Sequence, residues 1–365
     1  MNSNCLRILI QHRHKANEIA GVTSYIDLLK EEFEIKNIEH QVISTAETSF
    51  TAWIRSIWWS DIVYMHSNNP AFVLFSRLLL RKVVLMYHYK FYLTECSLEN
   101  ISFVERLKIE IRHLFSVKHL PLKWKLERIL QSLKLGGRLA ASYWSNELMA
   151  NTHFLASSTY LPKKIHVFPY PCPKELNSNA KTLQDLNNPL TFTFAGRLCK
   201  EKGVDILLAA VEKLVSTGCD FQVNIIGSGN LSDSLRKTAS QSGLDANIKF
   251  LGRLPLEETI ELMRRSIAVV VPSRWQEPAG RVVLEAATVG TSVIAARVGG
   301  MPELGGDECL YFEKEDVEGL YQAMVFCLNN PQKTLDSGLK LQARIQEKHS
   351  ISGHADNLLK LFQAI

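Results

Sequence analysis

Residues 269–303 read VVVPSRWQEPAGRVVLEAATVGTSVIAARVGGMPE, and this stretch decides the fold class. It opens with β-branched residues of the kind that a buried parallel strand needs, and Pro272 ends the run because proline has no N–H to donate to a sheet. The segments then follow in the order strand, polar loop, helix and strand, over 267–271, 272–280, 281–288 and 293–296. This order predicts one unit of a parallel sheet, in which ligands bind at the carboxyl ends of the strands.

Two carboxylates flank the loop of this unit: Glu277 lies within it and Glu285 lies on the predicted helix. The backbone N–H groups of Ala279, Gly280 and Arg281 would begin that helix without acceptors, which suits an anionic or hydroxyl-bearing ligand. Gly280 has no Cβ and would let a ligand approach the backbone. A carboxylate can accept two hydrogen bonds from a sugar diol, so this loop is a candidate sugar site. The alternative is that both carboxylates are solvated charges.

The sequence around these carboxylates resembles the retaining glycosyltransferases of family 4. The matching positions run from the first strand to a Gly-Gly-x-Pro-Glu turn: Pro272–Ser273, Glu277, Gly280, Glu285–Ala286, Gly290, Gly299–Gly300 and Pro302–Glu303. Family members usually have an aromatic residue before the glycine of the loop, where this chain has Ala279. The resemblance extends over nearly the whole chain and is strongest from Phe192 to Glu303. It implies an α/β protein with the GT-B fold, in which two Rossmann-like domains with parallel sheets face an interdomain cleft.

Two cations match the family's grip on the donor diphosphate. They occur in Gly-Arg-Leu and Glu-Lys-Gly, where Arg197 offers a planar fork and Lys202 a point charge, both suited to phosphate oxygens. As isolated surface cations they would carry no functional meaning. The resemblance implies a donor-binding set composed of Gly21, Arg197, Lys202, Gly227, Arg253, Glu277, Pro278, Ala279, Gly280, Arg281 and Glu285. Within it Glu277 would hold the sugar and Glu285 the ribose. Gly21 stands where the family has a glycine pair, and an ordinary turn glycine is the alternative.

The catalytic residues implied by the resemblance are Glu277, His88, Arg197 and Lys202. His88 ends a predicted strand, where similar enzymes place a histidine against the transferred sugar. His66 ends the preceding strand and competes for this role, and simple loop packing is the alternative for either. Catalysis would be electrostatic, with the cations stabilising the departing diphosphate. We expect no cofactor and no metal, since no D-x-D pattern is placed to bind one.

The chain is long enough for two domains, at a prior of about 150 residues each. Strands are predicted at 6–10, 40–43, 61–66 and 83–88, with a polar loop at 11–20 and a helix at 22–33, which is typical of a parallel sheet. Together with the resemblance, the sequence divides into an acceptor-side domain, a linker, a nucleotide-sugar domain and a terminal helix that crosses back: 1–172, 173–188, 189–346 and 347–365.

Composition indicates a reducing compartment and a possible membrane surface. The seven cysteines are odd in number and form no C-x-x-C pair. No signal-type segment or long apolar run occurs, so we expect a cytoplasmic protein. Residues 77–138 hold thirteen Lys or Arg against five acids, and such a basic, aromatic-containing stretch suits the anionic inner face of the plasma membrane. A solvated helix face is the equal alternative, and no motif supports nucleic-acid binding.

The function implied is transfer of a hexosyl group from a nucleotide-diphosphate sugar, UDP- or GDP-linked, to an acceptor hydroxyl. The transfer would retain anomeric configuration without a metal. A glycan or lipid-linked acceptor would fit bacterial surface polysaccharide or lipopolysaccharide assembly. Two alternatives stay open, a nucleotide-sugar epimerase on the same fold and a non-catalytic partner of another glycosyltransferase. The joint presence of the cations and carboxylates argues against the second.

Overall fold

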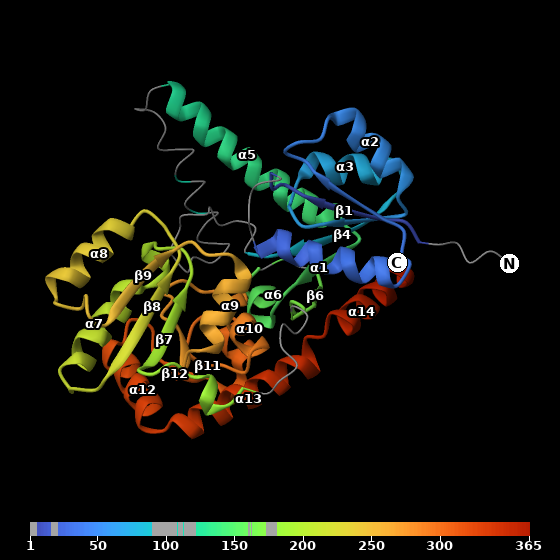
Figure 1. Ribbon diagram of the computed structural model, residues 1–365. Coiled ribbons are helices and arrows are strands. Elements are labelled where there is room, and N and C mark those ends of the chain that lie inside the picture. The colour runs from blue at the N-terminus through green and yellow to red at the C-terminus, as the bar shows by residue number, and fades with distance from the viewer. Residues whose placement is uncertain are drawn as a thin grey trace. The chain divides into compact units, whose positions relative to one another are not determined.

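The protein is known here from a computed structural model. It describes residues 6–15, 21–89, 108, 112, 122–159, 161, 163–172 and 181–365, without the side chains of 122–132. The chain divides into two compact units, and the first contains both ends of the sequence: unit 1 is Met1–Pro171 with Ile351–Ile365, and unit 2 is Cys172–Ser350. Each unit is a parallel sheet with helices on its faces (Figure 1).

Unit 1 has six strands in the order β2-β1-β3-β4-β5-β6, all pairs parallel. They are β1 (Ile8–His12), β2 (His40–Ser44), β3 (Ile62–Met65), β4 (Lys82–Tyr87), β5 (Glu147–Ala150) and β6 (Ile165–Val167). The helices are α1 (Gly21–Ile35), α2 (Phe50–Trp59), α3 (Pro70–Leu78), α5 (Leu122–Trp144), α6 (His153–Ser158) and α14 (Ile351–Ala364). Helices on its faces bury all of β3 and residues 83–87 of β4, which explains why these central strands are continuous apolar runs.

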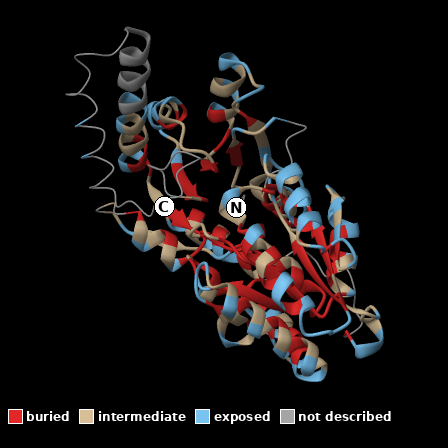
Figure 2. Cartoon of the chain, turned by 90° about the vertical axis from the view of Figure 1, so that its left-hand side faces the viewer, coloured by how far each residue is buried: buried red, intermediate tan, exposed pale blue. Residues whose placement is uncertain are grey.

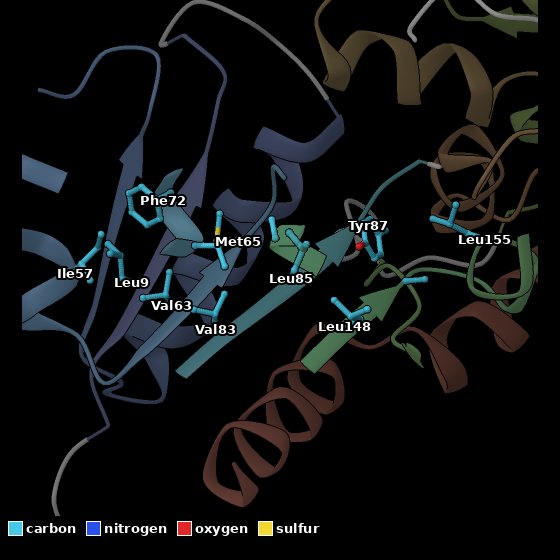
Figure 3. Close-up of a cluster of buried hydrophobic side chains, with 13 residues drawn as sticks. Leu9, Ile57, Val63, Met65, Phe72, Val83, Leu85, Tyr87, Leu148 and Leu155 are labelled. Carbon is cyan, nitrogen blue, oxygen red and sulfur yellow. The ribbon is translucent and has the colours of Figure 1, made fainter. Parts of the chain in front are cut away.

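Local signals in the sequence set these elements. Ser49 and Asn69 begin α2 and α3, because each side chain accepts a hydrogen bond from a backbone N–H of the first turn. Pro70 follows as the first residue of α3, where its missing N–H costs nothing. The inward side chains of the strands then form one core with residues of α2 and α3, as Figure 3 shows for Leu9, Val63 and Phe72.

The last helix of the chain packs on the first. His354 Nε2 of α14 hydrogen-bonds the Tyr25 hydroxyl of α1 over 2.7 Å, and Lys36 pairs with Asp356 at 2.8 Å. The buried Tyr25 also contacts the Tyr64 hydroxyl at 3.0 Å. The C-terminal segment is therefore part of unit 1, although more than 300 residues separate it from α1 in the sequence.

Unit 2 has the strand order β12-β11-β10-β7-β8-β9, again with all pairs parallel. The strands are β7 (Leu190–Ala195), β8 (Phe221–Ile226), β9 (Ile248–Gly252), β10 (Ala268–Val271), β11 (Ser292–Ala296) and β12 (Leu310–Phe312). The helices are α7 (Val204–Val215), α8 (Ser232–Gln241), α9 (Leu256–Arg264), α10 (Arg281–Thr288), α11 (Met301–Gly305), α12 (Val317–Asn329) and α13 (Pro331–Lys348). Short 3₁₀ turns are η2 (Leu183–Asp185), η3 (Lys200–Lys202) and η4 (Gly306–Glu308). Buried residues, red in Figure 2, include all of β10 and β11, whereas the edge strand β9 has exposed residues.

Both sheets have a topological switch point. In unit 1, β2 and β3 lie on opposite sides of β1. In unit 2, β8 and β10 lie on opposite sides of β7. Loops that leave neighbouring strands in opposite directions open a crevice at the carboxyl ends of those strands, where ligands bind in such folds. Each unit therefore offers one preferred ligand position.

The α/β class with two parallel sheets is confirmed, with shifted boundaries. The first strand begins and ends two residues later than expected, at Ile8 and His12, so the expected loop at 11–20 loses its first two residues to the sheet. Arg7 lies outside the strand, and its backbone N–H donates to an Asp61 carboxylate oxygen at 3.0 Å. Residues 16–20 and most of the expected basic membrane stretch, 90–107, 109–111 and 113–121, lie outside the described residues. In the described part, no helix is both long and apolar enough to span a bilayer.

Lys181 gives unit 2 a predicted dependence of stability on pH. The residue is 3% exposed, and its Nζ donates to the Ser266 carbonyl at 2.6 Å and the Thr291 hydroxyl at 2.7 Å. Burial lowers its pKa from 10.5 to about 7. Between these values the unfolded chain binds the extra proton, so the free energy of unfolding should rise with pH by up to about 1.4 kcal/mol per unit.

Urea unfolding from pH 7 to 9 tests this prediction. Lys181→Met removes the titrating group, so the free energy of unfolding should increase less with pH in this variant than in wild type. It should persist in the matched control Lys314→Met, at an exposed position. Equal pH slopes in wild type and Lys181→Met would refute the assignment.

Candidate functional site

The switch point of unit 2 brings together two of the predicted site residues. Lys202 lies in η3, after β7, and its Nζ forms an ion pair with Glu277 Oε1 in the loop after β10. The Ser273 hydroxyl donates to the same oxygen at 2.9 Å. Glu277 is only 7% exposed, and Oε2 has no hydrogen-bond partner among the described residues. Lys202 and Ser273 thus hold the buried Glu277 carboxylate through Oε1, which leaves Oε2 able to accept a hydrogen bond from a ligand.

Backbone hydrogen bonds join the loop that carries Glu277 to the turn after β7. The N–H groups of Arg274 and Trp275 donate to the Glu201 carbonyl at 2.9 and 3.3 Å. The Arg274 guanidinium also makes two bonds to the Asp205 carboxylate, at 2.5 and 2.6 Å. Gly203 is left-handed, with φ +65°, and a Cβ there would overlap the Pro272 carbonyl. The approach of the two segments therefore requires a glycine at 203.

The Gly-Gly turn after β11 fixes the same loop from another side. The Gly300 N–H donates to the Glu277 carbonyl at 2.8 Å, and the Gly299 N–H donates to Gln276 Oε1 at 2.6 Å. Gly299 has φ +58°, and a Cβ at this position would overlap the backbone of Glu277. The glycines of the sequence motif thus position the glutamate through the main chain.

Helix α10 begins immediately after this loop. In the described structure the backbone N–H groups of Ala279, Gly280 and Arg281 have no acceptor, as expected at a helix start. Glu285 lies on this helix with 14% of its side chain exposed, 3.5 Å from Arg281. Burial raises the pKa of Glu285, and the charges of Arg281 and Lys202 oppose that rise.

The alternative that Glu277 and Glu285 are solvated charges is wrong, since both side chains are largely buried. A Cβ at Gly280 would meet the Sδ and Cε atoms at the flexible end of the Met301 side chain. Met301 therefore occupies the side of Gly280 on which a Cβ would lie.

Three turns gather at the carboxyl ends of β7, β8 and β9. The Gly196 N–H donates to the Ile226 carbonyl at 3.0 Å, and the Gly227 N–H donates to the Gly252 carbonyl at 2.6 Å. Gly227 has φ +132°, and a Cβ would overlap the Gly196 carbonyl. The predicted residues Arg197 and Arg253 leave these turns with exposed side chains. Neither makes an ion pair with the described residues, so both cations are available to an anionic ligand.

The predicted histidines lie in unit 1 and form one group. His66 Nδ1 and His88 Nε2 are 2.9 Å apart, and His88 Nδ1 hydrogen-bonds the Tyr170 hydroxyl. Burial and the neighbouring histidines hold the pKa of His66 well below its ordinary value, so its imidazole is neutral at neutral pH. The two competing candidates are therefore coupled, and both line one cavity. Gly21, the remaining donor candidate, is the first residue of α1.

Several site residues escaped the sequence interpretation. Ser273 and Arg274 lie inside the quoted stretch, but nothing in their spacing indicated the carboxylates they bind. Tyr170 and Met301 were not among the predicted site residues. No group of three potential ligands that could hold a metal ion occurs among the described residues.

Comparison with known proteins relates this chain to glycosyltransferases. Residues 178–348 match the family model described as Glycosyl transferases group 1. A GDP-mannose-dependent monoacylated alpha-(1-6)-phosphatidylinositol monomannoside mannosyltransferase from Corynebacterium glutamicum is 28% identical over 214 residues, 56% of each chain. The D-rhamnosyltransferase WbpZ of Pseudomonas aeruginosa is 30% identical over 179 residues, 48% of this chain and 45% of its own. The chain therefore spans about half the length of these curated relatives.

Solved structures share the architecture over almost the whole chain. HepE of Anabaena, in complex with UDP and glucose, aligns with a TM-score of 0.72 at 17% identity, covering 99% of this chain and 100% of its own. The sucrose-phosphate synthase of Thermosynechococcus elongatus aligns with a TM-score of 0.71 at 15% identity, covering 98% of each chain. At these identities the likeness establishes the shared fold.

Proposed function

We propose, from the match of residues 178–348 to the Glycosyl transferases group 1 model and from the fold shared with HepE, that the protein transfers a sugar from a nucleotide-diphosphate donor to an acceptor hydroxyl. The observation that carries this proposal is the part-buried Lys202–Glu277 ion pair, which lies at the carboxyl ends of the same sheet whose β7 and β8 lead into the turns of Arg197 and Gly227. A cation, a presented carboxylate oxygen and unpaired backbone N–H groups together suit a sugar joined to a diphosphate.

Each part of the donor has residues suited to it. Arg197 and the N–H groups at the start of α10 would bind the diphosphate, with Lys202 neutralising charge as it departs. Glu277 Oε2 would accept from the sugar hydroxyls, and Glu285 from the ribose. HepE carries UDP and the corynebacterial relative uses GDP-mannose, so both bases are candidates for this chain.

The mechanism we infer is retaining, as the resemblance to family 4 implies. It needs no metal, because Arg197 and Lys202 supply the positive charge that a leaving diphosphate requires. His88 would contact the transferred hexosyl group, in a position fixed by its hydrogen bonds to His66 and Tyr170. The corynebacterial relative is named for a phosphatidylinositol monomannoside acceptor, which favours an acceptor in glycolipid or surface glycan assembly, such as polysaccharide or lipopolysaccharide. That setting would place the protein in the cytoplasm at the inner membrane face.

Product analysis tests the reaction. Purified protein incubated with UDP- and GDP-sugars should release nucleotide diphosphate in proportion to acceptor added. An epimerase would instead convert the sugar nucleotide without any acceptor. Failure of all nucleotide sugars and free nucleotide diphosphates to bind would remove the basis of the proposal.

Arg197→Ala should weaken binding of the free nucleotide diphosphate. Loss of a charge-assisted contact worth about 1.5–3 kcal/mol corresponds to a rise in Kd of about 10- to 150-fold. Calorimetry measures this directly. Arg265→Ala is the matched control, because Arg265 pairs only with Glu261 on α9 in the described structure, and it should bind like wild type. An unchanged Kd in Arg197→Ala would exclude it from the diphosphate grip.

Glu285→Gln should weaken the nucleotide with or without its sugar, since the ribose loses a charged acceptor. The raised pKa of Glu285 adds a pH signature. Protonation on acidification should weaken nucleotide binding at a pH above the ordinary carboxylate range, and Glu285→Gln should lack this step. Calorimetry of both proteins across acidic pH measures it. Normal nucleotide affinity in the variant would contradict the assignment to the ribose.

A further inference from the structure

Exposed apolar side chains gather at one edge of the unit 1 sheet, opposite to the carboxyl edge where ligands bind in such folds. Helices α2, α3 and α5 end at this edge, because they lead into the amino ends of β3, β4 and β5, which are neighbours in the sheet. We call this surface the amino edge of unit 1. The large apolar residues that it exposes are Trp58, Leu78, Leu80, Tyr143 and Trp144.

Hydrogen bonds join the ends of these three helices. Arg81, in the turn between α3 and β4, donates to the Trp58 carbonyl of α2 at 2.6 Å. Arg77 of α3 donates to Asn146 Oδ1 at 2.7 Å, and Asn146 lies between α5 and β5. The exposed apolar residues therefore belong to one surface, and exposed apolar surface of this kind marks an interaction site.

The amino edge is also positively charged. Its cations come from the segments before β4 and β6 and are Arg77, Arg81, Lys82 and Lys164, all exposed except the half-buried Arg81. The described acidic residues at the amino ends of β3 to β6 are Asp61 and Glu147. Asp61 pairs with Arg7 at 3.1 Å, and Glu147 contacts His166 at 2.9 Å. The edge therefore suits an anionic partner.

The arrangement of these residues favours a lipid bilayer as that partner. Leu80 is 86% exposed and lies in a short turn with Arg81 and Lys82. A leucine tip beside cations can place apolar atoms among acyl chains and charges at lipid phosphates. Tryptophan and tyrosine, which combine an apolar ring with a polar atom, are enriched at the boundary between the two. A second copy docked about a two-fold axis would instead bring the same cations face to face.

We propose that the amino edge of unit 1 docks on an anionic lipid bilayer, with its leucines in the acyl boundary, its aromatic rings among the headgroups and its cations on the phosphates. Only part of this surface belongs to the basic stretch 77–138 that the sequence indicated. The opposite edge of the sheet lies about 17–20 Å away for strands of five to six residues, so docking leaves the ligand crevice open. The inference deepens the proposed function, on which it rests for the purpose of docking, and suits an acceptor glycan already extended from the membrane.

Vesicle binding by the full chain tests the proposal without donor or acceptor. The probes are vesicles of phosphatidylcholine alone and of phosphatidylcholine mixed with an equal amount of phosphatidylglycerol. The protein should sediment with the anionic vesicles only, and added salt should release it. Leu80→Asn should raise the apparent Kd for anionic vesicles about tenfold or more, since an apolar group no longer enters the bilayer. Lys82→Gln should raise it about fivefold at low salt.

The variants are chosen so that the fold is kept. Leu80 has φ +59°, a conformation that asparagine adopts more readily than leucine, and Lys82 is exposed. The matched controls are Leu256→Gln on α9 and Lys237→Gln on α8, both at exposed positions of unit 2, and they should bind vesicles like wild type.

Three results would overturn this inference: equal binding to both kinds of vesicle, no binding to anionic vesicles, or an unaltered Kd in both Leu80→Asn and Lys82→Gln. The second would leave an acidic partner protein as the occupant of the edge. Nucleotide diphosphate binding should be equal in wild type and all four variants. Failure of nucleotide binding in wild type would count against the proposed function and not against docking, because vesicle binding is measured without nucleotide.

Discussion

Glu277→Gln should lower kcat by about 100- to 1,000-fold, the range seen when one group that stabilises a transition state is removed. Affinity for the free nucleotide diphosphate should stay nearly unchanged, because Glu277 is assigned to the sugar. The size of the effect follows from the geometry. Lys202 Nζ and the Ser273 hydroxyl both donate to Oε1. A glutamine must keep its oxygen toward these donors, so its NH₂ group replaces Oε2 and presents donors where the sugar hydroxyls need an acceptor.

Steady-state kinetics and calorimetry of Glu277→Gln, Lys202→Gln and the double variant measure this. Since the two side chains form one ion pair, their effects on kcat should be far from additive, as expected of groups in contact. Glu313→Gln is a suitable control, because Glu313 forms an exposed ion pair with Arg297, with 74% of its side chain exposed. Weak nucleotide binding in Glu277→Gln with intact binding in Glu285→Gln would show that the two roles are reversed.

Gly203→Ala should be among the most damaging single-methyl changes in unit 2. The chain offers a matched control, since Gly203 and Gly243 have nearly equal φ values of +65° and +69°. An alanine at Gly243 meets nothing within 4 Å, so it should cost only the strain of a left-handed residue, about 1–2 kcal/mol. At Gly203 the methyl group also overlaps the Pro272 carbonyl, and overpacking adds about 1–3 kcal/mol.

The same substitution should also impair activity. Relief of the overlap must move the loop that begins at Pro272 and carries Glu277, and a misplacement of about 1 Å can cost about 100-fold in rate. Urea unfolding and kinetics of both alanine variants separate strain from displacement. Similar stability and similar kcat in Gly203→Ala and Gly243→Ala would show that the loop does not depend on this approach.

Much of the fold could be predicted because its information is local. The β-branched runs, the turn glycines and the helix-spaced apolar residues predicted a parallel α/β architecture, and the helix Arg281–Thr288 begins and ends where expected. Strand ends were less certain, as the two-residue shift of β1 shows. At the start of this strand the Arg7 N–H binds Asp61, which is 54 residues away, and at its end Gln11 and His12 pair with β2.

The sequence by itself determined the residue types available at each strand end: carboxylates after β10, cations after β7 and histidines after β3 and β4. Only the tertiary structure decided their partners and their burial. Lys202 and Glu277 are 75 residues apart in the chain and meet because β7 and β10 are neighbours in the sheet. The exposed apolar residues of the amino edge of unit 1 come from positions as distant as Trp58 and Trp144. Periodicity and turn chemistry act over a few residues, whereas strand order places distant residues side by side, so pairing and desolvation are properties of the folded sheet.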